Sequence, residues 1–125
     1  MSADKEDRPL YFIGSSREDL KEFPEHVMRQ IGHALRVAQS GGKSPNAKPF
    51  KEVGSGVLEV VADYDGNTYR SVYAVQLASG VYVLHCFQKK SKHGIETSKK
   101  DIDLIKQRLA KAIEQDRDFR SSDHA

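Results

Sequence analysis

Residues 81–90 read Val-Tyr-Val-Leu-His-Cys-Phe-Gln-Lys-Lys, a strand-like apolar run that ends in two lysines. A similar run, Tyr69-Arg70-Ser71-Val72-Tyr73, lies just before it, and only a short turn at Ala78-Ser79-Gly80 separates the two. Such short turns connect antiparallel neighbours. A third run, Val57–Ala62, precedes both and is followed by Asp65-Gly66-Asn67, a strong hairpin signal. The sequence therefore predicts an antiparallel meander with strands at 57–62, 68–77 and 81–88.

The segments on either side of the meander predict one more strand and three helices. Leu10–Ile13 is a short apolar run that is typical of a strand. Ser16–Glu22 and Pro24–Gln39 have helical patterns, and Ser98 caps a final helix with an apolar face. Residues 43–56 are rich in Gly, Ser, Pro and Lys, which predicts a loop. The expected fold class is α+β, with the element order β-α-α-β-β-β-α.

The 125 residues, of which 38% are hydrophobic and 30% charged, fit one globular domain. We expect this domain to span residues 9–115, between a flexible N-terminus at 1–8 and a flexible tail at 116–125. The single cysteine, Cys86, excludes an internal disulfide and favours a reducing compartment. The sequence has no run of about 18 apolar residues and no signal-peptide pattern, so we expect a cytoplasmic protein without a membrane partner.

Motifs for cofactors and metals are missing from the sequence. It has no Walker-type glycine loop, no dinucleotide fingerprint and no paired-cysteine zinc pattern, so we expect neither a cofactor nor a metal. His85 and His93 are eight residues apart, which is not a ligand spacing. His26 and His33 are expected on the surface of the long helix. Cys86 is expected to be a small buried hydrophobe rather than a nucleophile.

The chemistry that remains is cationic. Arg70 alternates with Tyr69 and therefore points to the opposite, polar face of the sheet, where it is either a solvated residue or a phosphate ligand. Lysines gather in the loop at 43–51 and at 89–92, although the net charge is only +2. A local basic surface beside aromatic residues suggests an anionic partner, most simply RNA. Residue types alone do not distinguish RNA binding from RNA cleavage.

Three of these segments together resemble the bacterial RelE superfamily of toxins, and most closely its HigB-like, phage-derived branch. They are Lys51–Val60 (KEVGSGVLEV), Tyr69–Tyr73 and Leu84–Ser91. Gly94–Ser98 and the helical segment Lys100–Ala112 also fit that branch. The resemblance implies a RelE-like fold, which is a twisted, mainly antiparallel four-stranded sheet with two N-terminal helices packed on one side, and a C-terminal helix.

The same resemblance implies a function. The chain would be the toxin of a type II toxin–antitoxin system, a metal-independent mRNA endoribonuclease that works with the ribosome. It would form a hetero-oligomer with a HigA-like helix-turn-helix antitoxin. In such enzymes the RNA 2′-hydroxyl attacks the adjacent phosphate, and basic residues replace a histidine pair. Matched by position, Arg70 is the implied transition-state clamp. The other implied catalytic residues are Lys51, Lys89 and Lys90, one of which would act as general base. The implied RNA-binding residues are Lys48, Lys92 and His93.

Two other functions stay open at this point. Leu58-Glu59 is followed by Val60, where many RelE-like toxins have an arginine. ParE-like members of the superfamily inhibit DNA gyrase and cut no RNA, although they lack the full basic set. The third alternative is an RNA- or protein-binding module that is not toxic.

Overall fold

The chain forms a five-stranded mixed sheet whose centre is the predicted meander. The computed structural model describes residues 7–89 and 97–123. The strand order is β1-β5-β4-β3-β2, in which β1 and β5 are parallel and the other neighbours are antiparallel. The α+β class is confirmed, but a four-stranded sheet was wrong, because a fifth strand is present. The strands are β1 (Leu10–Phe12), β2 (Ala47–Pro49), β3 (Val57–Tyr64), β4 (Asn67–Ala74) and β5 (Val81–Lys89).

The additional strand, β2, lies inside residues 43–56, the segment that the sequence analysis predicts as a loop. It pairs antiparallel with β3, so that Ala47 lies opposite Val60. A short 3₁₀ helix, η2 (Lys51–Val53), follows it. Proline is tolerated in such an edge strand because its missing N–H removes no bond from the inner ladder. The sequence did not reveal this strand because Ala-Lys-Pro is not an apolar run and lies among other loop-forming residues.

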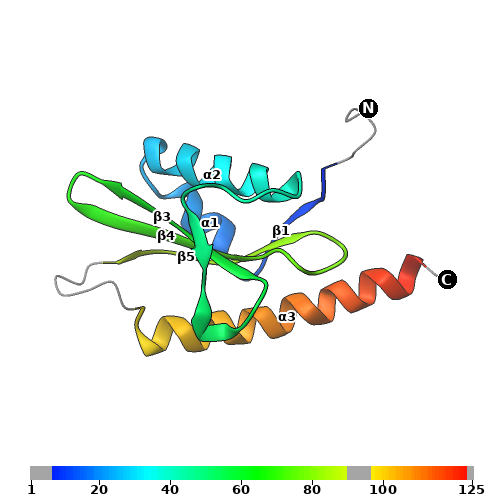
Figure 1. Cartoon of the computed structure of the whole chain (residues 1–125). Coiled ribbons are helices and arrows are strands. Elements are labelled where there is room, and N and C mark those ends of the chain that lie inside the picture. The colour runs from blue at the N-terminus through cyan, green and yellow to red at the C-terminus, as the bar shows by residue number, and fades with distance from the viewer. Residues whose placement is uncertain (1–6, 90–96, 124–125) are drawn as a thin grey trace.

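Helices cover both faces of the sheet (Figure 1). α1 (Ser16–Lys21) and α2 (Glu25–Gln39) lie on one face, as predicted, and α3 (Lys99–Asp123) crosses the other. None of the helices in the described part of the chain combines the length and apolar character that a membrane span needs. Each face has its own core. The core under α1 and α2 includes Leu20, Val27, Ile31, Leu35, Tyr73 and Val83, and the core under α3 includes Val72, Tyr82, Leu84, Ile105 and Ala112.

The helix α3 continues past residue 115, where the sequence analysis ends the domain. Residues 116–123, expected in a flexible tail, are helical up to Asp123. Asp116 is buried and accepts a hydrogen bond of 2.7 Å from the backbone N–H of Ser79. Ser79 in turn hydrogen-bonds the hydroxyl of Tyr82 at 2.6 Å. A buried carboxylate therefore ties this polar end of α3 to the turn between β4 and β5.

A residue expected in the flexible N-terminus is tied to the same turn. The guanidinium of Arg8 donates to the carbonyl oxygens of Val75 at 2.7 Å and Gly80 at 3.0 Å. The side chain of Gln39, at the end of α2, donates to the carbonyl of Arg8 at 2.7 Å. These hydrogen bonds hold the residues before β1 against the β4–β5 turn and the end of α2.

Candidate active site

Arg70 lies on β4 and is buried. Its side chain is 4% exposed, and Nη1 donates to Glu59 Oε1 at 2.6 Å, in an ion pair with a carboxylate that is 9% exposed. The prediction that Arg70 points away from the face of Tyr69 is confirmed, because Tyr69 packs in the core under α1 and α2. The expectation that the face of Arg70 is open to solvent was wrong, since α3 and a second core cover that face.

Two of the predicted lysines lie on the same face as Arg70. Lys48 is directly opposite Glu59 in the β2–β3 pair, and opposed residues project to one face of a sheet. Lys89 ends β5 opposite Thr68, two positions from Arg70 along β4. Lys48 is exposed and Lys89 is half-buried. The structure therefore brings three cations, Lys48, Arg70 and Lys89, to the α3 side of the sheet, which we call the cationic face.

The other predicted site residues lie outside the strands of the sheet or outside the described residues. Lys51 begins η2, between β2 and β3, and its side chain is exposed. Because η2 packs against α3, Lys51 lies on the same side of the molecule as the three cations above. Lys90, Lys92 and His93 lie outside the described residues.

A histidine that the sequence analysis did not select also lies on this face. A register shift at Val72 and Tyr73 places His85 opposite Val72 in the β4–β5 pair. His85 Nε2 is 2.8 Å from Oδ1 of Asp101, in the first turn of α3. Phe87 stacks on the imidazole, with ring centroids 4.4 Å apart and an interplanar angle of 16°. One signal in the sequence points to this arrangement: His85, Phe87 and Lys89 alternate along one face of β5.

The surroundings of His85 favour its neutral form. Burial lowers the pKa of His85 below its ordinary value of 6.5, although the hydrogen bond and the charge of Asp101 act in the opposite direction. The neutral ring donates its Nε2–H to the carboxylate, which can only accept. Its Nδ1 is buried and has no hydrogen-bond partner among the described residues. His85 therefore links the first turn of α3 to the strand that carries Lys89.

The cap of α3 completes this link. The backbone N–H of Asp101 donates to the hydroxyl of Ser98 at 3.1 Å, and that hydroxyl donates to Asp101 Oδ2 at 2.8 Å. The predicted capping role of Ser98 is confirmed. One carboxylate thus serves both the helix cap and His85, which fixes the start of α3 over the cationic face.

Cys86 is not activated, and no metal cluster forms within residues 7–89 and 97–123. There, no group of three or more His, Cys, Asp or Glu side chains comes together as a possible ligand set. Burial raises the pKa of Cys86 to about 11, and Sγ donates to Ser71 Oγ at 3.4 Å. The prediction of a small buried hydrophobe is confirmed. His26 and His33 are exposed on α2, also as predicted.

A family match covers most of this fold. Residues 18–110 match the family described as "Phage derived protein Gp49-like (DUF891)". The chain therefore belongs to the Gp49-like family, which is a family of RelE/HigB-like toxin type. The matched region runs from α1 into α3 and includes the three-strand cationic face. No curated protein and no solved structure showed significant similarity to the chain.

Proposed function

We propose that this chain is the toxin of a type II toxin–antitoxin pair, of the HigB-like branch, and that it cleaves mRNA on the ribosome. Membership of the Gp49-like family supports the toxin class. The observation that carries the nuclease assignment is that Lys48, Arg70 and Lys89, on three different strands, share one face of the sheet. A cationic face of this kind attracts the phosphates of RNA.

The proposed reaction is a transfer within the RNA chain. The 2′-oxygen attacks the adjacent phosphorus and loses its proton, the bond from phosphorus to the 5′-oxygen breaks, and that oxygen takes up a proton. The products are a 2′,3′-cyclic phosphate and a 5′-hydroxyl. Negative charge grows on the phosphate oxygens during the attack, where fixed cations stabilise it.

The exposed lysines meet the RNA first in this proposal. Lys48 and Lys51 are exposed and bind its phosphates. Lys89 lies at the end of β5, and Lys90 is the next residue in the sequence. One lysine of this set acts as the general base. Lys92 and His93 are further RNA-binding residues in this proposal.

Arg70 is buried, unlike the exposed Lys48 and Lys51, and contributes a fixed positive charge. Because Glu59 holds its Nη1 at 2.6 Å, the guanidinium has a fixed orientation before RNA binds. Fixed charges stabilise a transition state without a cost of reorganisation. Removing Arg70 alone would leave the Glu59 carboxylate buried and uncompensated, so a test of Arg70 has to change both residues.

The function is tested by inducing the protein in a bacterium and sequencing RNA 5′-ends. We expect slowed growth, new 5′-ends inside translated messages, and recovery when a helix-turn-helix antitoxin from the adjoining gene is co-expressed. The double variant Lys48→Gln/Lys51→Gln should reduce cleavage about tenfold or more, because two charge-assisted phosphate contacts disappear. The matched control is Lys21→Gln/Arg36→Gln, which removes two exposed cations from α1 and α2.

The outcomes separate three functions. Intact messages together with altered plasmid supercoiling would identify a ParE-like gyrase inhibitor. Normal growth at verified soluble expression would support a binding module without toxicity. Equal loss of cleavage in Lys48→Gln/Lys51→Gln and in the control Lys21→Gln/Arg36→Gln would contradict a site on the α3 side of the sheet.

A further inference from the structure

The sheet has an open edge at β1. β1 is the last strand in the order and pairs with β5, and no described strand pairs with its other side. The backbone N–H of Ile13 donates to Val83 O, and Pro9 O accepts from the N–H of Val81, both at 2.9 Å. Because backbone groups alternate along a strand, those of Leu10 and Phe12 face away from β5. Such an edge is a template for another extended chain.

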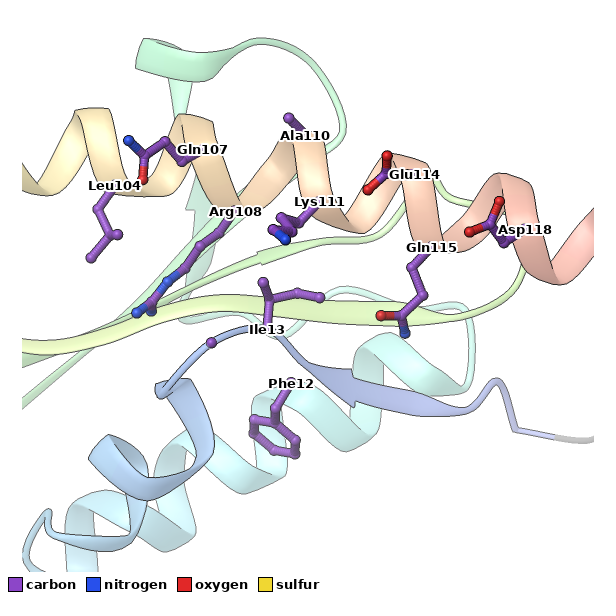
Figure 2. Close-up of a pocket in the computed structure, with 11 residues that line it drawn as sticks. Phe12, Ile13, Leu104, Gln107, Arg108, Ala110, Lys111, Glu114, Gln115 and Asp118 are labelled. Atoms are coloured by element: carbon purple, nitrogen blue, oxygen red, sulfur yellow. The ribbon is translucent and has the colours of Figure 1, made fainter.

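A groove of about 970 Å³ lies beside this edge, between β1 and α3 (Figure 2). Ile13 points toward α3, and Phe12 points to the opposite side of the strand. Leu104 and Ala110 of α3 add apolar surface. The groove therefore offers both a hydrogen-bonding edge and an apolar wall to one occupant.

Arg108 is the fixed cation of the groove. Its guanidinium donates to Leu84 O at 2.9 Å and to Ser15 Oγ at 3.1 Å, and Ser15 in turn donates to Asp19. The guanidinium lies so close to Gly14, whose φ is +60°, that a Cβ there would be 2.7 Å from Arg108 Nε. Among the described residues Arg108 forms no ion pair with a carboxylate. A half-buried cation held by neutral acceptors favours an anionic group from a ligand.

Charge follows an order along the groove. Arg108 and Lys111 come first on α3, and Glu114 and Asp118 follow toward its C-terminus. Tyr11 stacks on Phe119 with centroids 5.2 Å apart, and Gly14 lies against Arg108, so β1 runs antiparallel to α3. The basic part of the groove thus lies at the Ile13 end of β1, and the acidic part lies at the Leu10 end.

We infer that the groove between β1 and α3 binds an extended segment of the antitoxin, which adds to β1 as a further strand. The segment presents a carboxylate to Arg108 and Lys111, and a basic side chain to Glu114 and Asp118. RNA fits less well, because the two carboxylates would repel its phosphates. The identity of the partner rests on the proposed function, but the strand-adding edge does not.

A charge swap within the groove tests this inference. Lys111→Glu/Glu114→Lys keeps the net charge and changes two exposed side chains outside the cationic face of the nuclease. The variant should remain toxic and should need at least tenfold more antitoxin for recovery of growth. The matched control, Glu25→Arg/Arg29→Glu, swaps an exposed ion pair on α2 and should be neutralised like the wild type. Unchanged neutralisation of the groove variant would overturn the inference.

Hydrogen exchange locates the contact directly. In the toxin–antitoxin complex the amides of Leu10 and Phe12 should exchange at least tenfold more slowly than in the free toxin, because both gain a strand partner. A complex that protects other residues but leaves these two amides unchanged would reject the groove.

A peptide test keeps the inference separate from the toxin assignment. If the wild-type protein proves harmless, an eight-residue Thr-Val peptide with one glutamate and one lysine serves as the probe. It should protect Leu10 and Phe12 and bind about tenfold more weakly to Lys111→Glu. Failure to protect either amide at millimolar peptide would overturn the open-edge proposal itself.

Discussion

The two faces of the sheet are built from the same strands but differ in what they bury. The face under α1 and α2 is filled by apolar and aromatic side chains, such as Tyr73 and Val83. The face under α3 has an apolar core at one part and ionisable groups at another, where Glu59 pairs with Arg70 and His85 pairs with Asp101.

The proposed function gives the two faces different roles. Apolar packing stabilises the α1/α2 face with no need for a specific charge. A buried ion pair such as Glu59–Arg70 contributes little net stability compared with apolar residues of similar size, so its presence points to another role. In the proposed function that role is to hold fixed charge near RNA phosphates.

The largest expected effect comes from breaking the buried pair. Arg70→Met alone should lower the free energy of unfolding by about 3–5 kcal/mol, because the Glu59 carboxylate stays buried without a partner. Glu59→Leu/Arg70→Met should recover most of this loss, since it buries no charge. Urea denaturation of the two variants measures the difference. On the other face, Ile31→Val sets the scale of an ordinary packing change, about 0.5–1.5 kcal/mol.

Two results would contradict these roles of the two faces. If Arg70→Met lowered the free energy of unfolding no more than Ile31→Val, Glu59 and Arg70 would not form a buried ion pair. If the double variant were stable and cleaved RNA at the wild-type rate, Arg70 would have no part in the chemistry.

A smaller effect is expected from pH. Because burial lowers the pKa of His85 in the folded state, the unfolded chain binds a proton more readily than the folded chain. This contribution to the free energy of unfolding is therefore fully present above pH 6.5, the ordinary value, and is lost as pH falls through the lower pKa of the folded state. Denaturation at a series of pH values should show this loss, and His85→Gln should reduce it. An identical pH dependence in the variant would contradict a neutral, buried His85.

The smallest effect on stability is expected at the surface of the α3 side. Lys48 and Lys51 are exposed, so Lys48→Gln/Lys51→Gln should leave the free energy of unfolding unchanged. RNA binding should change instead. If each lysine neutralises one phosphate, the slope of log affinity against log salt should become less steep by about 1.4, at about 0.7 per contact with a single strand. A slope equal to that of the wild type would remove both lysines from the RNA surface.

The main elements of the fold were readable from local patterns. The helical pattern of Pro24–Gln39 predicted α2 with its correct C-terminal end, and Asp65-Gly66 predicted the β3–β4 turn, where both residues have positive φ. β2 was missed, because Ala47-Lys48-Pro49 has no apolar run of the kind that predicted β1, which is equally short. The end of α3 was missed because its last turns are polar, and only the contact of Asp116 with Ser79 makes one of those residues internal.

Part of the candidate site was also predictable from a local sequence pattern. Strand alternation correctly separated Arg70 from Tyr69, since side chains along a strand project to alternate faces. The partner of Arg70 was not predictable, because Glu59 lies 11 residues away and reaches it only through the β3–β4 register. His85 was set aside as an isolated histidine, and its pairing with Asp101 depends on where α3 begins.

The strands of the meander, the helices and the number of cations follow from the order and spacing of neighbouring residues. Which of those cations are exposed depends on tertiary packing. α3 crosses the second face, so Arg70 became a buried ion pair while Lys48 stayed in solvent. The same crossing leaves β1 as an open edge beside a groove. Burial depends on how distant segments pack, and a local sequence pattern does not record which element covers a given face.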